Sequence, residues 1–216
     1  MIISRGRQFI FVHIPKTGGT SLALALEGRA MKDDLMLGDT PKALNRRRRL
    51  KGVEARGRLW KHSTLADIDG LVSRDEMAGM FCFTLVRNPW DRMVSYYHWL
   101  RDQRFDHPAV ALAQVHDFHG FLRQPPVQGA IRAQPYGRYV TDAEGVERAD
   151  LFLRLEHLEA DLAPLEAHLG FRIGPVPHVN TSNRDRDWRP YYGDSEAEIV
   201  AKLCETDIKR FGYAFS

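Results

Sequence analysis

Long apolar runs and cysteines are both scarce in this chain of 216 residues. No stretch approaches the roughly 18 uninterrupted apolar residues that a membrane-spanning helix needs. The apolar part of residues 1–14 is too short for the core of a secretion signal. Two cysteines, Cys82 and Cys204, exclude a disulfide framework. These absences predict a cytoplasmic protein in a reducing environment, without a transmembrane segment.

Internal repeats, low-complexity tracts and Gly/Ser linkers are also missing, so nothing marks a boundary between domains. Hydrophobic residues make up 44% and charged residues 27% of the chain, which is ordinary globular composition. This length is enough to enclose a sizeable core. We therefore expect a single domain over residues 1–216.

The net charge of +3 is too small to indicate a nucleic-acid partner. It is unevenly spread, however. Residues 42–61 hold nine lysines and arginines against Glu54, a local charge of +8, which leaves −5 for the rest of the chain. Such a run is typical of a solvated surface or of an anionic contact. We expect residues 30–58 to form a mobile basic insertion, or a lid over an anionic ligand.

Apolar runs alternate with amphipathic stretches along the chain. Short runs predict strands at residues 9–13, 59–62, 80–86 and 151–155, and a hairpin at 138–148. Helical spacing predicts helices from Thr20, from Asn88, over 156–169 and over 200–211. This alternation predicts an α/β fold of three layers, P-loop-like, with a central parallel sheet flanked by helices.

Residues 13–21 join the first of these strands to the first helix. Glycines at this position let the backbone wrap around an anion, and the helix start presents free N–H groups. Lys16 adds a positive charge. The remaining candidate anion ligands are Thr17, Gly18, Gly19, Thr20 and Ser21. An ordinary capped turn is the alternative, but this combination favours a phosphate-binding loop.

The order of residues in this loop differs from that of a Walker A loop, because Lys16 precedes the glycines. Nucleotide hydrolysis or phosphoryl transfer also uses an acidic residue at a strand end to hold Mg²⁺. Here Arg87 follows the strand of residues 80–86. Both observations count against a Mg²⁺-dependent nucleoside or nucleotide kinase, or an NTPase, which we keep as the alternative function. We predict that the protein uses no metal.

Residues 87–97 supply a second candidate anion site. Arg87 lies at a strand's carboxyl end, where α/β sheets bind ligands, and Ser95 falls two turns into the next helix. A purely structural interpretation also fits, in which Arg87 pairs with an acid and Ser95 packs.

Together the two motifs resemble the sulfotransferase superfamily, most closely the branch of carbohydrate sulfotransferases with many bacterial members. Residues 13–21 resemble its loop for the 5′-phosphosulfate of 3′-phosphoadenylyl sulfate (PAPS). Residues 87–97 resemble its 3′-phosphate motif. Weaker similarity covers 178–184 with Tyr191-Tyr192, and 207–213. Residues 30–58 and 105–132 match nothing in the family, so we expect them to select the substrate.

The resemblance implies in-line transfer of a sulfuryl group from PAPS to an acceptor hydroxyl of a carbohydrate or small molecule, leaving adenosine 3′,5′-bisphosphate (PAP). It assigns Lys16 to charge on the leaving oxygen, and Arg87 and Ser95 to the 3′-phosphate. The cosubstrate would be PAPS, with no metal and no nucleic-acid partner.

The acceptor hydroxyl must lose a proton, and a histidine suits this task. Lys61-His62 resembles a pair that carries the base in some relatives, so His62 is the candidate base. His62 could instead be a structural residue that caps the next helix. His178 and Glu156 are the other candidates.

Overall fold

The computed structural model describes residues 1–176, 184–185 and 187–215. The chain divides into two compact units. The first comprises residues 1–86 and 136–179, and the second comprises residues 87–135 and 180–216. We describe each unit by itself.

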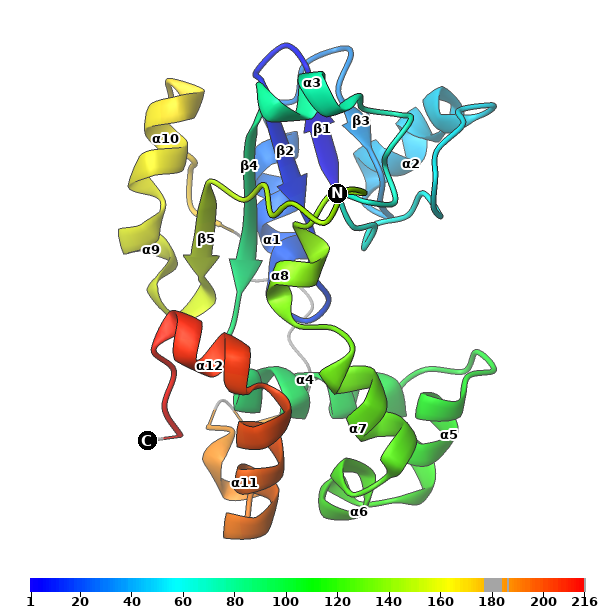
Figure 1. The fold of residues 1–216 in the computed structure, drawn as a ribbon, viewed down its shortest axis with the longest axis vertical. Helices are drawn as coiled ribbons and strands as arrows, with labels where there is room; N and C mark the ends of the chain where they lie inside the picture. Colours follow the sequence, from blue (N-terminus) through cyan, green and yellow to red (C-terminus); the bar gives the residue numbers. More distant parts are fainter. Residues whose placement is uncertain (177–183, 186, 216) are drawn as a thin grey trace. The chain divides into compact units, whose positions relative to one another are not determined.

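Five strands of the described chain form one sheet in the first unit. They are β1 (Ile2–Ser4), β2 (Phe9–Val12), β3 (Leu35–Met36), β4 (Phe81–Val86) and β5 (Leu151–Arg154). The strand order is β3-β1-β2-β4-β5. The arrows of β2, β4 and β5 point the same way in Figure 1, because β2 pairs with β4, and β4 with β5, in parallel.

The predicted parallel sheet is thus confirmed for these three strands. The sheet is mixed, because β1 pairs antiparallel with both β2 and β3. Strands of two or three residues carry no periodic signal, so the sequence did not indicate them.

Helices in the first unit flank this sheet. They are α1 (Gly19–Glu27), α2 (Pro41–Arg46), α3 (Arg74–Ala78), α8 (Tyr136–Tyr139), α9 (Leu158–Asp161) and α10 (Ala163–Leu169), with 3₁₀ turns η1 (Arg47–Leu50) and η2 (Leu155–His157). The expected insertion 30–58 thus contains β3, α2 and η1. Whether it moves stays a prediction.

Alternate residues of β2 face opposite sides of the sheet, and both sides are covered. Phe9 and Phe11 pack in one hydrophobic cluster with Leu22 of α1 and Leu165 of α10. Ile10, which faces the other side, is fully buried as well. Burial of both faces is what a three-layer α/β fold requires, and it accounts for the uninterrupted apolar runs of the parallel strands.

The predicted strand at residues 59–62 is wrong, and the predicted hairpin at 138–148 is shortened. Residues 59–62 form a turn, in which the Ser63 hydroxyl accepts from the Trp60 N–H and donates to the Arg58 carbonyl. The expected hairpin at 138–148 begins inside α8. Its two segments still pair around a turn: Thr141 and Glu147 form an antiparallel bridge, the Asp142 N–H donates to the Val146 carbonyl, and the Arg148 N–H donates to the Val140 carbonyl. At residues 59–62 the Ser63 side chain bonds to the backbone in place of ladder hydrogen bonds.

The second unit is helical in the described residues. Its helices are α4 (Pro89–Arg101), α5 (Pro108–Val115), α6 (Phe118–Leu122), α7 (Pro125–Arg132), α11 (Asp194–Leu203) and α12 (Glu205–Phe211), with the 3₁₀ turn η3 (Arg189–Tyr191). The helix expected from Asn88 is confirmed, and Asn88 caps it: its side chain accepts from the Trp90 N–H at 3.0 Å. Trp90, Val94, Phe121 and Val200 belong to its core.

Two expected helices are interrupted. The helix over 156–169 is divided into η2, α9 and α10, and that over 200–211 is divided at Cys204 into α11 and α12. Gly170 ends α10 with φ 73°, the left-handed conformation in which a glycine commonly follows a helix. Among the described residues, no helix combines the length and apolarity that crossing a membrane demands.

Candidate active site

The loop between β2 and α1 has the backbone of an anion-binding turn. Lys16 and Gly18 both have positive φ, 66° and 86°, and Gly18 caps α1 without a side-chain hydrogen bond. Lys16 occupies a conformation that non-glycine residues rarely adopt, and such strain concentrates at functional sites. The first turn of α1 contains no acidic residue. The positive end of the helix is therefore not neutralised by its own residues.

The Thr17 hydroxyl, a candidate anion ligand, is bonded within the loop itself. The Thr17 side chain is fully buried, and its hydroxyl donates to the Ile14 carbonyl at 2.9 Å. It braces the loop from inside, so its backbone N–H is the group left for an anion. Thr20 and Ser21 are half-buried in the first turn of α1.

Gly19 is required by its neighbour rather than by its φ angle. A Cβ at this position would lie 2.2 Å from Cδ2 of His13. The His13 ring thus packs directly against the backbone of the first turn of α1. It is buried, and burial together with neighbouring positive charges lowers its pKa well below 6.5.

His62 lies beside this loop, although the strand expected to carry it is absent. Its Nδ1 is 2.8 Å from the His13 carbonyl oxygen, and the two rings meet edge to face at 4.7 Å. The Trp60 ring packs edge to face against His62 at 5.0 Å. A tertiary hydrogen bond, instead of a sheet ladder, holds His62 in place.

The protonation of His62 follows from this contact. A carbonyl oxygen only accepts, so Nδ1 carries the proton and Nε2 is left as an acceptor. Burial, followed by the charges of Lys61 and the amino terminus, lowers the pKa of His62 to about 4, against its ordinary 6.5. The imidazole is therefore neutral at physiological pH and able to take a proton through Nε2.

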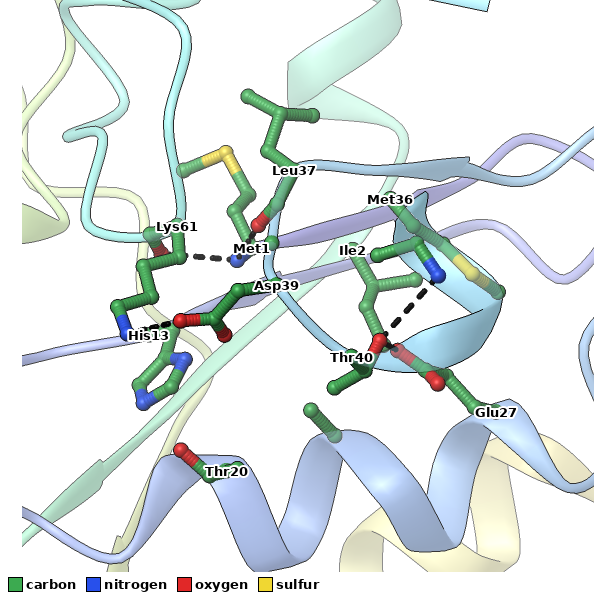
Figure 2. Close-up of a pocket in the computed structure, with 13 residues that line it drawn as sticks. Met1, Ile2, His13, Thr20, Glu27, Met36, Leu37, Asp39, Thr40 and Lys61 are labelled. Carbon is green, nitrogen blue, oxygen red and sulfur yellow. Dashed lines mark hydrogen bonds and ion pairs between the residues drawn. The ribbon is translucent and has the colours of Figure 1, made fainter. Parts of the chain in front are cut away.

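A small pocket adjoins the loop on the side of α1. Figure 2 shows the His13 ring above Thr20, with the Lys61 ammonium next to the Asp39 carboxylate. The Lys61–Asp39 ion pair has an N–O distance of 2.5 Å. Further along the pocket, Glu27 is buried and accepts from the Thr40 hydroxyl. Both hydrogen-bond donors and hydrogen-bond acceptors thus line this pocket.

Arg87 belongs to the second unit and is the residue directly after β4. Its Nε and Nη2 lie 2.7 and 2.6 Å from Oδ2 of Asp91, whose Oδ1 is 2.5 Å from Nη2 of Arg184. All three side chains are largely buried. Two guanidinium groups thus contact one carboxylate.

Ser95 is buried in α4, four residues after Asp91. Side chains four residues apart share a helix face, so Ser95 lies on the Asp91 side of α4. Arg87, through its ion pair with Asp91, and Ser95 thus lie on the same side of this segment. The structural interpretation of Arg87 also has a basis, because Asp91 is its ion-pair partner.

Sequence reasoning missed two features of this second site. The Arg87–Asp91 spacing was visible as an i, i+4 pair, but Arg184 is 93 residues from Asp91 and only folding brings it there. His98, three residues after Ser95, has a buried Nε2 with no hydrogen-bond partner among the described residues. Burial and the charge of Arg184 lower the pKa of His98.

The other two candidate bases are His178 and Glu156. His178 lies outside the described residues, as does most of the loop 178–184. Glu156 is exposed in η2. Nearby, Arg154 forms an ion pair with Asp161, which supports a structural part for this segment.

Comparison with known proteins concerns the family and the fold. The model of the Sulfotransferase family matches residues 1–214. The chain is similar to the crystal structure of mouse sulfotransferase SULT7A1 complexed with PAP, at 18% identity and a TM-score of 0.58. The match covers 98% of this chain and 90% of the mouse chain. No curated protein matches it significantly. At this identity the likeness to the mouse enzyme concerns the fold, whereas the family model spans nearly all residues of both units. The chain therefore belongs to the sulfotransferase family.

Proposed function

We propose that the protein transfers a sulfuryl group from PAPS to an acceptor hydroxyl. The observation that carries this proposal is the loop from His13 to Ser21, where the uncapped start of α1, with no acid in its first turn, meets Lys16. N–H groups at the start of a helix, the helix dipole and a lysine would suit a dianionic phosphosulfate. Membership of the sulfotransferase family supports the same chemistry.

The residues would divide the work between two anion sites. The backbone N–H groups from Thr17 to Thr20, with the hydroxyls of Thr20 and Ser21, would hold the 5′-phosphosulfate, because the Ser21 N–H already donates to the Gly18 carbonyl. Arg87 and Ser95 would hold the 3′-phosphate. Arg87 and Arg184 bring two guanidinium groups to Asp91, and guanidinium groups are well suited to bind a phosphate. We propose that both units serve this one activity.

Lys16 would act on the leaving group. When the bond between sulfur and the bridging oxygen breaks, negative charge develops on that oxygen, and a positioned ammonium stabilises it. Because the transition state carries more charge there than the bound cosubstrate, Lys16 would contribute more to turnover than to binding.

His62 would accept the proton. As the acceptor oxygen forms its bond to sulfur, its proton passes to Nε2 of His62, whose Nδ1 is held by the His13 carbonyl. Nε2 carries no proton at neutral pH, where the imidazole is neutral, since the pKa of His62 is about 4. The His13 ring packs on Gly19 and against the His62 ring, and would thereby hold His62 in position beside the phosphate loop. The acceptor would be a small molecule or a glycan.

Arg87 argues against a Mg²⁺-dependent kinase or NTPase. It follows β4 directly, at the place where such enzymes hold the metal with an acid. In the proposed reaction, arginine and lysine side chains supply the positive charge.

The test is calorimetric binding of PAP and of AMP without Mg²⁺. Two separate anion sites predict that PAP binds much more tightly, since each charge-assisted hydrogen bond to the 3′-phosphate is worth about 1.5–3 kcal/mol. Equal affinities for the two nucleotides would refute the second site. Binding that needs Mg²⁺ would favour the kinase alternative.

A further inference from the structure

The basic run from residue 42 to 61 has two sets of side chains with different surroundings. One set points inward and donates to the protein itself. Arg46 donates to the Met31 carbonyl at 2.7 Å, and Lys61 pairs with Asp39. Other members of this set are Lys42, which donates to the Glu27 carbonyl, and Arg49, which donates to the Asp34 carbonyl. These cations stabilise the fold and are only partly available to a ligand.

The second set points outward. Arg47, Arg48 and Lys51 are exposed, and none of them pairs with an acidic side chain in the part of the chain that the structure describes. Leu44 is 50% exposed. It precedes Arg47 by three residues and Arg48 by four. Side chains at this spacing share a helix face. Ala43, one residue earlier, is buried, so α2 has a covered side and an apolar-basic outer side.

The neighbouring loop has the same character. Trp60 is 41% exposed, and the Arg58 guanidinium lies over its ring at 5.1 Å from the centroid. The Lys61–Asp39 ion pair joins this loop to the segment that starts α2. Apolar and aromatic side chains among unpaired cations are the composition of surfaces that lie in a membrane interface.

We propose that the outer side of α2 and η1, made of Leu44, Arg47, Arg48 and Lys51, docks on an anionic lipid bilayer. The cations would meet the negative surface potential, and Leu44 would enter the boundary between headgroups and acyl chains. A soluble polyanion would use the cations but gain nothing from an exposed leucine. This difference favours the bilayer and also provides the test. The proposal does not depend on the proposed sulfuryl transfer.

The experiment is co-sedimentation of the full chain with vesicles of phosphatidylcholine alone and of phosphatidylcholine with phosphatidylglycerol. We expect binding to the anionic vesicles only, weakening as salt rises. Arg47→Ala with Arg48→Ala should lower partitioning about 25-fold, since each surface cation is worth about fivefold. Leu44→Ser should lower it by up to about tenfold.

Matched control variants come from the second unit. Arg104→Ala with Arg132→Ala removes two exposed arginines, and Val115→Ser replaces an apolar side chain that is 74% exposed. These variants should bind vesicles as the unchanged chain does. All variants should keep the same melting temperature, because the replaced groups are exposed.

Three results would overturn the proposal. They are absence of binding to anionic vesicles, equal weakening by the control pair of arginines, and binding to heparin that needs Arg47 and Arg48 but is indifferent to Leu44→Ser. The last would assign the surface to a soluble polyanion instead. Vesicle binding does not report sulfuryl transfer, so failure here leaves the proposed reaction standing.

Discussion

The two compact units present their candidate anion sites by different means. In the first unit the donors are backbone N–H groups at the start of α1, with Lys16 beside them and no acid in the first helical turn. In the second unit the donors are guanidinium groups, already paired with Asp91. A backbone site is present as soon as the loop folds, whereas a side-chain site must share its charge with an internal partner. Substitutions should therefore affect the two sites differently.

The largest effect is expected from His62→Ala. If His62 is the base, turnover should fall by about 10²–10⁴-fold while the affinity for PAP is unchanged, because no phosphate contact is removed. Steady-state kinetics and calorimetry measure the two quantities. His168→Ala is the matched control, since His168 stacks on Phe81 at 4.6 Å in the same unit and has no proposed role. Full turnover of the His62 variant would pass the role to His178 or Glu156.

Lys16→Ala should be next. We expect turnover to fall by about 10²–10³-fold, with a smaller loss of PAP affinity, because the N–H groups of α1 remain. Lys32→Ala, which removes an exposed lysine of the first unit, is the control. Losses of equal size in turnover and in PAP binding would make Lys16 a simple electrostatic anchor and weaken the distinction between backbone and side-chain donors.

Arg87→Ala should separate the two sites most sharply. PAP affinity should drop about 10- to 100-fold, whereas AMP affinity, which lacks the 3′-phosphate, should hardly change. Calorimetry with both nucleotides checks this, and circular dichroism checks the fold. If PAP and AMP affinities fall together, or if the variant unfolds, Arg87 is structural and its ion pair with Asp91 is its main role.

The smallest effect at neutral pH concerns protonation. Burial favours the neutral imidazole of His62, so activity should stay level from pH 7.5 to pH 5.5 and fall only as pH approaches its pKa of about 4. An unperturbed histidine would give the acidic limb near 6.5. In the unfolded chain His62 binds a proton below about 6.5, so its contribution to stability should also decrease as pH falls from 6.5 to 4. A limb near 6.5 in the pH–rate profile would contradict this assignment.

Local patterns were enough to predict the elements that the site depends on. The apolar run before Pro15 predicts β2, the run before Arg87 predicts β4, and Asn88-Pro89 predicts the start of α4. Each signal lies within a few residues, where backbone preferences and capping act. The position of the phosphate loop between a strand and a helix followed from the same local information.

His62 lies beside the phosphate loop, but the strand predicted at residues 59–62 is not what places it there. A strand at residues 59–62 was expected to bring it to the sheet edge, but this segment is a turn. His62 reaches the loop through the His13 carbonyl, 49 residues away. No periodicity encodes that hydrogen bond, because it joins a side chain to a backbone group remote in sequence.

The sequence by itself determined the parallel strands β2, β4 and β5, the glycine loop, the cap of α4 and the family, because each depends on neighbours along the chain. Only the tertiary structure decided which cations of residues 42–61 hold carbonyl groups and which stay exposed, that Thr17 braces the loop, and that Asp91 pairs with Arg184. These outcomes depend on burial and on partners brought together from distant segments. Burial also fixes the low pKa of His62, since the cost of a charge depends on what surrounds the ring in the folded chain.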